Sequence, residues 1–178
     1  MKKLIASLCI SLAGLLTAPA LAQQLTPAQQ STLRAFAAAD PAASQLMASA
    51  DDVGFAAWLN TPTGYVIWNP TVTPEQWDAA MMAGITQMDG LTVGKRDTLF
   101  VVMSRTRDCR DASVRASIDD LTGTQNTLKA ALQAACKRPA TRAEQALSTG
   151  TGTTAAPGTA AWVGVLSYAD ASYIRSAP

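Results

Sequence analysis

The residues of this chain with the clearest capacity for covalent chemistry are two cysteines, Cys109 and Cys136. A disulfide between them would close a loop of about 27 residues and stabilise the fold by roughly 3–4 kcal/mol. The alternative is a pair of buried free thiols, because unpaired cysteine is among the most buried residue types. Two features described below, a secretion signal and a helical hairpin, favour the disulfide.

Acid–base and nucleophilic catalysis find little support in the remaining residues. The sequence contains no histidine, which removes the commonest general base and the commonest metal ligand. Asp119 and Asp120 form the best local carboxylate pair for glycoside hydrolysis. Adjacent residues of a helix point about 100° apart, however, so solvated helix surface is the better interpretation. We therefore predict no catalytic, cofactor-binding or metal-binding residue, and a protein that is not an enzyme.

A basic group formed by Lys137, Arg138 and Arg142 could bind an anion beside the predicted helix start at Thr141. The alternative is a favourable interaction with the end of the preceding helix, together with solvation. Trp162 follows a glycine-rich loop and could be an exposed anchor at an interface, since tryptophan is enriched at binding hot spots, or a core residue. The possible interaction surface comprises Arg138, Arg142, Gly150, Gly152 and Trp162.

The start of the chain has the three parts of a secretory signal peptide. Two lysines are followed by an apolar run from Leu4 to Leu16, and residues 20–22 provide a small-residue cleavage site. The run is too short to span a bilayer. We expect residues 1–22 to be removed, Cys9 to leave with them, and the mature chain to be periplasmic or secreted. The alternative is a buried N-terminal helix of a protein that stays in the cytoplasm.

Charge and hydropathy restrict the classes of partner. Removing Lys2 and Lys3 from the 14 basic residues leaves 12, against 13 acidic residues, so the mature chain has a formal net charge of −1. This balance gives no electrostatic case for binding nucleic acid. No apolar run after the leader approaches membrane-spanning length, so we expect no stable membrane insertion after signal cleavage.

Two predicted helices position the cysteine pair. Asp111 can cap a first helix, which carries apolar residues at helical spacing through Leu121 and ends at Gly123. Thr124 is the candidate cap of a second helix, which cannot continue past Pro139. A turn of about two or three residues folds such helices back antiparallel. This arrangement brings together the two cysteines, one just before the first helix and one at the end of the second.

Several more helices are predicted from their start signals. These starts are Thr26-Pro27, Asp40-Pro41, Asp51-Asp52, Thr73-Pro74 and the capping box from Thr141 to Glu144. The stretch Leu91–Arg105 fits either a buried strand or a helix with a basic end, and its length and helical neighbours favour the helix. A last helical turn is expected from Tyr168 to Tyr173, with fraying from Arg175 onward.

Strand-forming residues are few. Tyr65–Trp68 is a short predicted strand, and Ala161–Leu166 is expected to pair with it. The sequence therefore predicts a mainly α fold, a compact bundle of about five to seven short helices with a small two-stranded β element near the C-terminus. Residues 23–178 are expected to form a single helical domain with a frayed C-terminal end.

Three segments, Lys137–Glu144, Ser148–Gly152 and Gly164–Tyr168, together resemble a group of small proteins encoded in the genomes of tailed bacteriophages and prophages. The similarity extends more weakly through most of the mature chain. Those proteins tend to be encoded among virion structural genes, so the resemblance implies a particle-building or interaction role without catalysis. The secretion leader and the predicted disulfide depart from that pattern, because virion parts assemble in the cytoplasm.

These observations lead to one main functional hypothesis. The protein is expected to be a non-enzymatic interaction or structural protein of phage-derived type, exported and stabilised by a disulfide, with a protein partner or self-association. One alternative is a head–tail or tail component of a virion, assembled in the cytoplasm. Another is a periplasmic enzyme or enzyme inhibitor whose site forms only in three dimensions.

Overall fold

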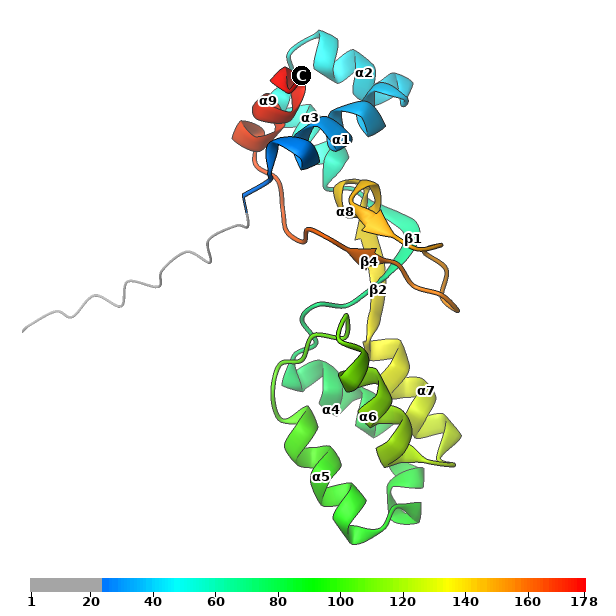
Figure 1. The fold of residues 1–178 in the computed structure, drawn as a ribbon. Coiled ribbons are helices and arrows are strands. Elements are labelled where there is room, and N and C mark those ends of the chain that lie inside the picture. Colours follow the sequence, from blue (N-terminus) through cyan, green and yellow to red (C-terminus); the bar gives the residue numbers. More distant parts are fainter. Residues whose placement is uncertain (1–23) are drawn as a thin grey trace, which may run out of the picture.

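The computed structural model describes residues 24–178, and the predicted signal peptide with Cys9 lies outside the described residues. The described part is mainly helical, which confirms the predicted fold class at that level. Figure 1 shows two groups of helices joined by a narrow sheet, rather than one compact bundle. None of the described helices combines the length and the apolar character that a membrane crossing requires.

We call the group that contains both described ends of the chain the terminal lobe, and the other group the middle lobe (Figure 1). The terminal lobe comprises α1 (Pro27–Ala38), α2 (Pro41–Ala48), α3 (Asp52–Leu59), α8 (Arg142–Ala146) and α9 (Tyr168–Ser176). The middle lobe comprises α4 (Pro74–Ala83), the 3-10 helix η1 (Ile85–Gly90), α5 (Val93–Met103), α6 (Ala112–Thr122) and α7 (Asn126–Ala135). Residues 24–178 thus form ten helices, more than the five to seven expected.

Most helices begin where their capping residues predict. In α1 the hydroxyl of Thr26 accepts from the backbone of Gln29 while the Gln29 side chain accepts from the backbone of Thr26, which satisfies two otherwise unpaired N–H groups. Asp40, Asp51 and Asp111 each cap the following helix with a carboxylate oxygen. The remaining predicted starts, at Thr73 and Thr141, are also confirmed.

The predicted hairpin of α6 and α7 is present, with one difference in its turn. Gly123 ends α6 with a positive φ of 55°, a conformation that glycine adopts at low cost. The residue before α7 is Gln125 and makes no capping bond with its side chain, so the expected cap at Thr124 is wrong. Helix α7 ends at Ala135 and the chain enters a strand at Lys137, which explains why no helix reaches Pro139.

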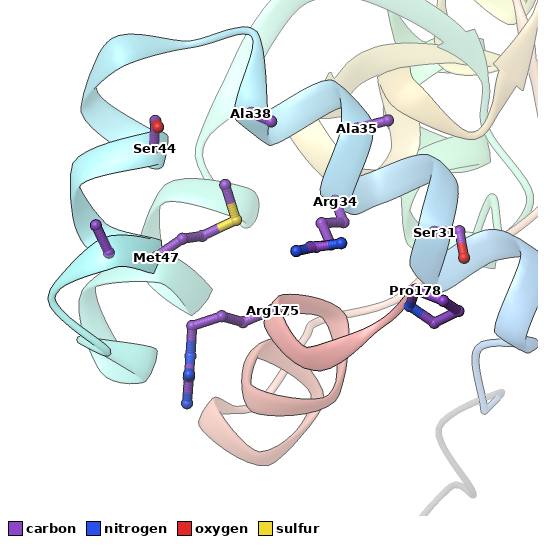
Figure 2. A pocket seen from close by; sticks show the side chains of 9 residues that line it. Ser31, Arg34, Ala35, Ala38, Ser44, Met47, Arg175 and Pro178 are labelled. Carbon is purple, nitrogen blue, oxygen red and sulfur yellow. The ribbon is translucent and has the colours of Figure 1, made fainter.

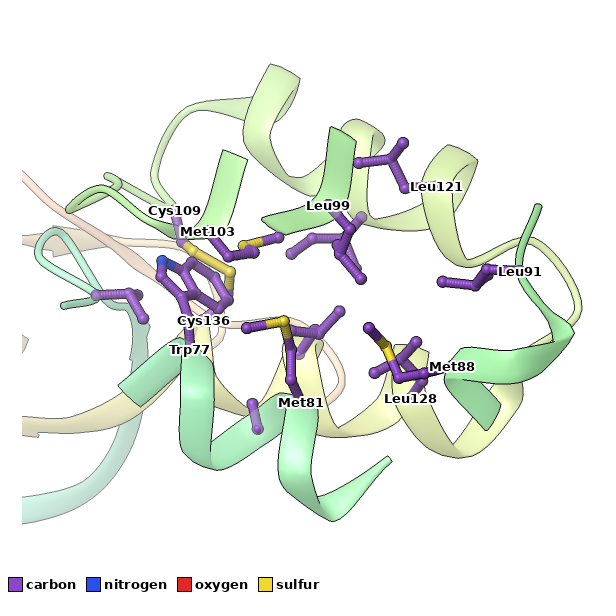
Figure 3. Packing of buried hydrophobic residues seen from close by; sticks show 14 residues of the cluster. Trp77, Met81, Met88, Leu91, Leu99, Met103, Cys109, Leu121, Leu128 and Cys136 are labelled. Atoms are coloured by element: carbon purple, nitrogen blue, oxygen red, sulfur yellow. A yellow bond between two sulfur atoms is a disulfide. The ribbon is translucent and has the colours of Figure 1, made fainter. Parts of the chain in front are cut away.

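The middle lobe has its own hydrophobic core. Figure 3 shows Trp77 and Met81 from α4 facing the disulfide and Leu99 and Met103 from α5. The ambiguous stretch after Leu91 is therefore helical, as favoured, since α5 contributes one buried face to this core. All members of this cluster come from a single continuous part of the chain, residues 72–136.

The terminal lobe is built from two distant parts of the chain. Leu33 from α1 and Phe55 and Leu59 from α3 pack with Ile174 from α9 in a second buried cluster. Because Ile174 is fully buried, α9 continues to Ser176 instead of ending at Tyr173, and the expected fraying from Arg175 is corrected.

The sheet pairs a different strand from the one expected. Strand β1 (Pro62–Trp68) includes the predicted strand residues, but it pairs antiparallel with β2 (Lys137–Thr141), with Trp68 opposite Lys137 and Ile67 opposite Arg138. Residues 161–166 form no strand. A second small pair joins β3 (Ser148–Thr149) to β4 (Thr159–Ala160). The chain thus passes from the terminal lobe to the middle lobe along β1 and returns along β2 (Figure 1).

Candidate interaction site

The two cysteines lie where the middle lobe meets the sheet. Their sulfur atoms are bonded in the structure, and their Cα atoms are 5.4 Å apart. Asn69, just after β1, ties both backbones together, because its N–H donates to the Cys136 carbonyl at 2.8 Å and its carbonyl accepts from the Cys109 N–H at 3.0 Å. The disulfide therefore closes the base of the middle lobe. Its formation in the cell stays a prediction.

The basic group is used within the molecule. Arg138 donates to both carboxylate oxygens of Glu144, at 2.8 and 2.6 Å, and Glu144 is only 2% exposed. The guanidinium of Arg142 lies over the ring of Trp58, 4.7 Å from its centroid, and donates to the Trp58 carbonyl at 3.2 Å. The ammonium of Lys137 donates to a loop carbonyl, at Thr154. These contacts leave the group with little capacity to recruit an anion.

The glycine-rich loop also makes internal contacts, and it covers the free edge of β1. The N–H of Val66 donates to the Gly152 carbonyl at 2.7 Å, and the carbonyl of Val66 accepts from the N–H of Gly158 at 2.9 Å. The ring of Tyr65 lies against both glycines, at positions where an added Cβ would overlap it. Its hydroxyl donates to the Gly150 carbonyl at 2.9 Å. The loop thus acts as an additional strand that protects an edge.

Trp162 is 1% exposed and belongs to the core of the terminal lobe, so of its two alternatives the core residue is correct and the exposed anchor is wrong. Gly152 is buried as well, whereas Gly150 is exposed. The five residues of the predicted interaction surface are therefore close in sequence but do not form one open patch. Sequence reasoning missed this because Tyr65, which contacts Gly150 and Gly152, and Trp58, which contacts Arg142, come from a segment about 80 residues away.

Several carboxyl groups of the described chain have pKa values lowered by hydrogen bonds within the fold. Hydrogen bonds from Arg175 lower the pKa of Asp52, and those from Thr73 and from its own backbone lower the pKa of Glu75. Partial burial raises the pKa of Asp108, but bonds from Arg110 outweigh it and the net pKa is lowered. A general acid at neutral pH needs the opposite shift. Residues 24–178 also contain no cluster of three or more side chains that could hold a metal ion.

A groove of about 650 Å³ lies between α1, α2 and α9 (Figure 2). Helix α1 contributes Ser31, Arg34, Ala35 and Ala38, which recur at the spacing of one helix face. Helix α2 contributes Ser44, Met47 and Ala48 with the same periodicity, and Arg175 and Pro178 complete the lining. The small side chains of the two helices leave the space open, and the volume falls in the range of ligand sites.

The groove contains one charged side chain, that of Arg34, that is not used in a contact within the described fold. Its side chain is exposed and makes no hydrogen bond or ion pair with any residue in 24–178. Figure 2 shows Arg34 and Met47 pointing toward one another across the groove, from α1 and α2. Arg175, by contrast, donates from Nε and Nη2 to Asp52 at 2.8 and 3.2 Å, and this pair is formally neutral. Among the described residues no Asp or Glu side chain lines the groove, and Arg34 is the lining cation that has no partner within residues 24–178.

A sequence signal for this groove existed, but it is weak. The positions from Ser31 to Ala38 place small residues and one arginine on a single face of α1. Alanine-rich faces occur in many helices, and nothing in the sequence indicates that α2 and α9 flank this one.

The chain matches no known protein family, no curated protein and no solved structure, so the candidate site stands on its own geometry.

Proposed function

We propose that this protein is an exported, non-enzymatic binding protein that engages a protein partner through the groove between α1, α2 and α9. The observation that carries the proposal is the guanidinium of Arg34, which lies in a 650 Å³ groove and has no partner among residues 24–178. Other arginines of the terminal lobe and the sheet, Arg138, Arg142 and Arg175, are each occupied by a contact within the fold. A groove that is open and charged at once is suited to binding.

A binding role accounts better than catalysis for the chemistry of the described residues. The shifted carboxyl groups all have lowered pKa values, with Asp111 as a further case caused by bonds from the Ser113 backbone and side chain. Lowered values keep carboxylates charged and paired, as in structural ion pairs. The described residues that line the groove include two serines, Ser31 and Ser44, but no general base beside either of them.

Export is supported by the predicted signal peptide and by the position of the cysteines. A disulfide at the base of the middle lobe is expected to persist only in an oxidising compartment. The phage-derived type is supported by the motif resemblance alone. Intact mass of the protein from fractionated cells tests export directly: loss of residues 1–22 with both cysteines oxidised supports it. A full-length chain with free thiols in the cytoplasm would instead favour assembly into a virion.

The binding role is tested by site-specific photo-crosslinking in cells. A photoreactive amino acid replaces Ala38 in the groove or, as the matched control, Ala130 on the exposed surface of α7 in the middle lobe. We expect a discrete cross-linked product from position 38 that the substitution Arg34→Glu removes, and no such product from position 130. Equal cross-linking at both positions, or a product from position 38 that is indifferent to Arg34→Glu, contradicts the proposal.

A further inference from the structure

We propose that the groove recognises a carboxylate on an apolar peptide segment of the partner, with Arg34 as the residue that holds the carboxylate; this assignment rests on the proposed function. The ligand class follows from the chemistry of the lining. One unpaired guanidinium provides the charge, and the walls consist of small or flexible side chains, mostly apolar, with two serines among them.

The charge of the groove selects an anion. Arg34 offers a planar set of N–H donors that matches the two oxygens of a carboxylate. Asp52 already satisfies two of the nitrogens of Arg175, so the second arginine fixes the rim and adds no net charge. A carboxylate on a ligand can therefore pair with Arg34, the one lining cation that has no partner among residues 24–178.

The walls of the groove select an apolar segment beside that charge. Ala35 and Ala38 of α1 and Met47 and Ala48 of α2 line the groove, and alanine side chains allow another backbone to approach closely. Methionine is flexible and adapts to the shape of the side chain that contacts it. The groove thus fits small or aliphatic side chains flanking a glutamate or an aspartate.

Nucleic acid and phosphorylated ligands fit this site less well. Recognition of a phosphate backbone relies on several cations along a track, and the described lining of the groove contains only one unpaired cation. Phosphate-binding motifs use clusters of arginines or backbone N–H groups at a helix start. The lining residues of α1 begin at Ser31, beyond the first turn of the helix that starts at Pro27.

The test uses two fluorescein-labelled, C-terminally amidated hexapeptides that contain alanine and leucine with either two glutamates or two glutamines. Binding to the purified, oxidised protein is followed by fluorescence anisotropy. The variants are Arg34→Gln and, as the matched control, Arg105→Gln. Arg105 is also exposed and makes no side-chain hydrogen bond or ion pair with the described residues, but it lies in the middle lobe outside the groove. Neither substitution removes a contact, so both variants are expected to fold.

We expect the glutamate peptide to bind at least about tenfold more tightly than the glutamine peptide, as one charge-assisted pair implies. Arg34→Gln should remove this difference, and Arg105→Gln should preserve it. Equal binding of the two peptides, an equal loss in both variants, or no saturable binding of the glutamate peptide overturns the assignment. If the peptides fail while the cross-link from position 38 persists, the groove keeps its binding role; loss of both rejects the proposed function as well.

Discussion

Arg138 and Glu144 form a two-pronged ion pair that joins strand β2 to helix α8. The same carboxylate accepts from the Thr141 N–H at 3.0 Å and completes the capping box of α8. One buried side chain therefore fixes the start of a helix and its angle to the sheet. This dual role explains why an acidic residue is tolerated at 2% exposure.

Replacing this carboxylate is expected to destabilise the fold. Glu144→Gln keeps the shape of the side chain but loses charge-assisted hydrogen bonds, and we expect a loss of about 1.5–3 kcal/mol in the free energy of unfolding, measured by urea denaturation. The matched control is Asp119→Asn, in the exposed pair with Lys129 at 3.7 Å, where the change should stay below about 1 kcal/mol. Equal effects in the two variants would show that the burial of Glu144 has no energetic consequence.

The loop that covers β1 depends on Gly152. Its φ is +67°, and an added Cβ would overlap the ring of Tyr65, so Gly152→Ala should cost roughly 2–4 kcal/mol through backbone strain and overpacking. Gly64→Ala is the control, in the strand that this loop covers, because no atom lies within 4 Å of its added Cβ. The control should be neutral or stabilising by up to about 1 kcal/mol. Thermal and urea unfolding both report the difference, and a tolerated Gly152→Ala would refute the packing described.

Removing the disulfide is expected to weaken the middle lobe first. Its loop spans 27 residues, so Cys109→Ala with Cys136→Ala should lower the free energy of unfolding by about 3–4 kcal/mol. Reduction of the unaltered protein should have a similar effect, and reductant should not affect the double variant. Hydrogen exchange localises the change, with faster exchange in α6 and α7 than in α1 and α3. Unchanged stability after reduction would mean that the bridge constrains little.

The ion pair of α9 predicts a dependence of stability on pH. Hydrogen bonds from Arg175 hold the pKa of Asp52 below its ordinary value, so the pair stabilises the fold at pH values above about 4, the unfolded-state pKa. That contribution is lost as the pH falls from there through the lower folded-state pKa. Asp52→Asn should therefore lose less stability than the unaltered protein between pH 6 and pH 3. Asp78→Asn, at an exposed position, serves as control and should follow the unaltered protein.

Local signals predicted much of the fold, and distant contacts account for the rest. Thr26, Asp40 and Asp111 start their helices because capping depends on residues two or three positions away. The predicted pairing of β1 with residues 161–166 is wrong. The true partner, β2, is separated from β1 in sequence by the whole middle lobe, and strand-forming residues near Trp162 are an equally plausible match by local pattern. Burial of Trp162 depends on α1, α3 and α9 meeting in space, which no local pattern encodes.

For the candidate site too, local patterns in the sequence predict less than contacts between distant residues determine. The cysteine pair was predicted from a helical hairpin, a local arrangement, and the two residues do lie together. The basic residues Arg138 and Arg142 looked available in sequence, but their availability depends on which side chains surround them. No sequence pattern indicates a role for Arg34. What sets it apart is that its side chain has no partner within residues 24–178, and only the folded structure shows this.

The arrangement of the two lobes along the chain also sets the order in which they can fold during synthesis. The middle lobe uses only residues 72–136 for its core, so it can close once Cys136 has emerged. The terminal lobe needs α9, the last helix described, to cover Leu33 and Phe55. Its first three helices therefore keep an exposed apolar face until α9 has been synthesised. Because α9 forms part of the lining, the groove cannot bind a partner before that helix is in place.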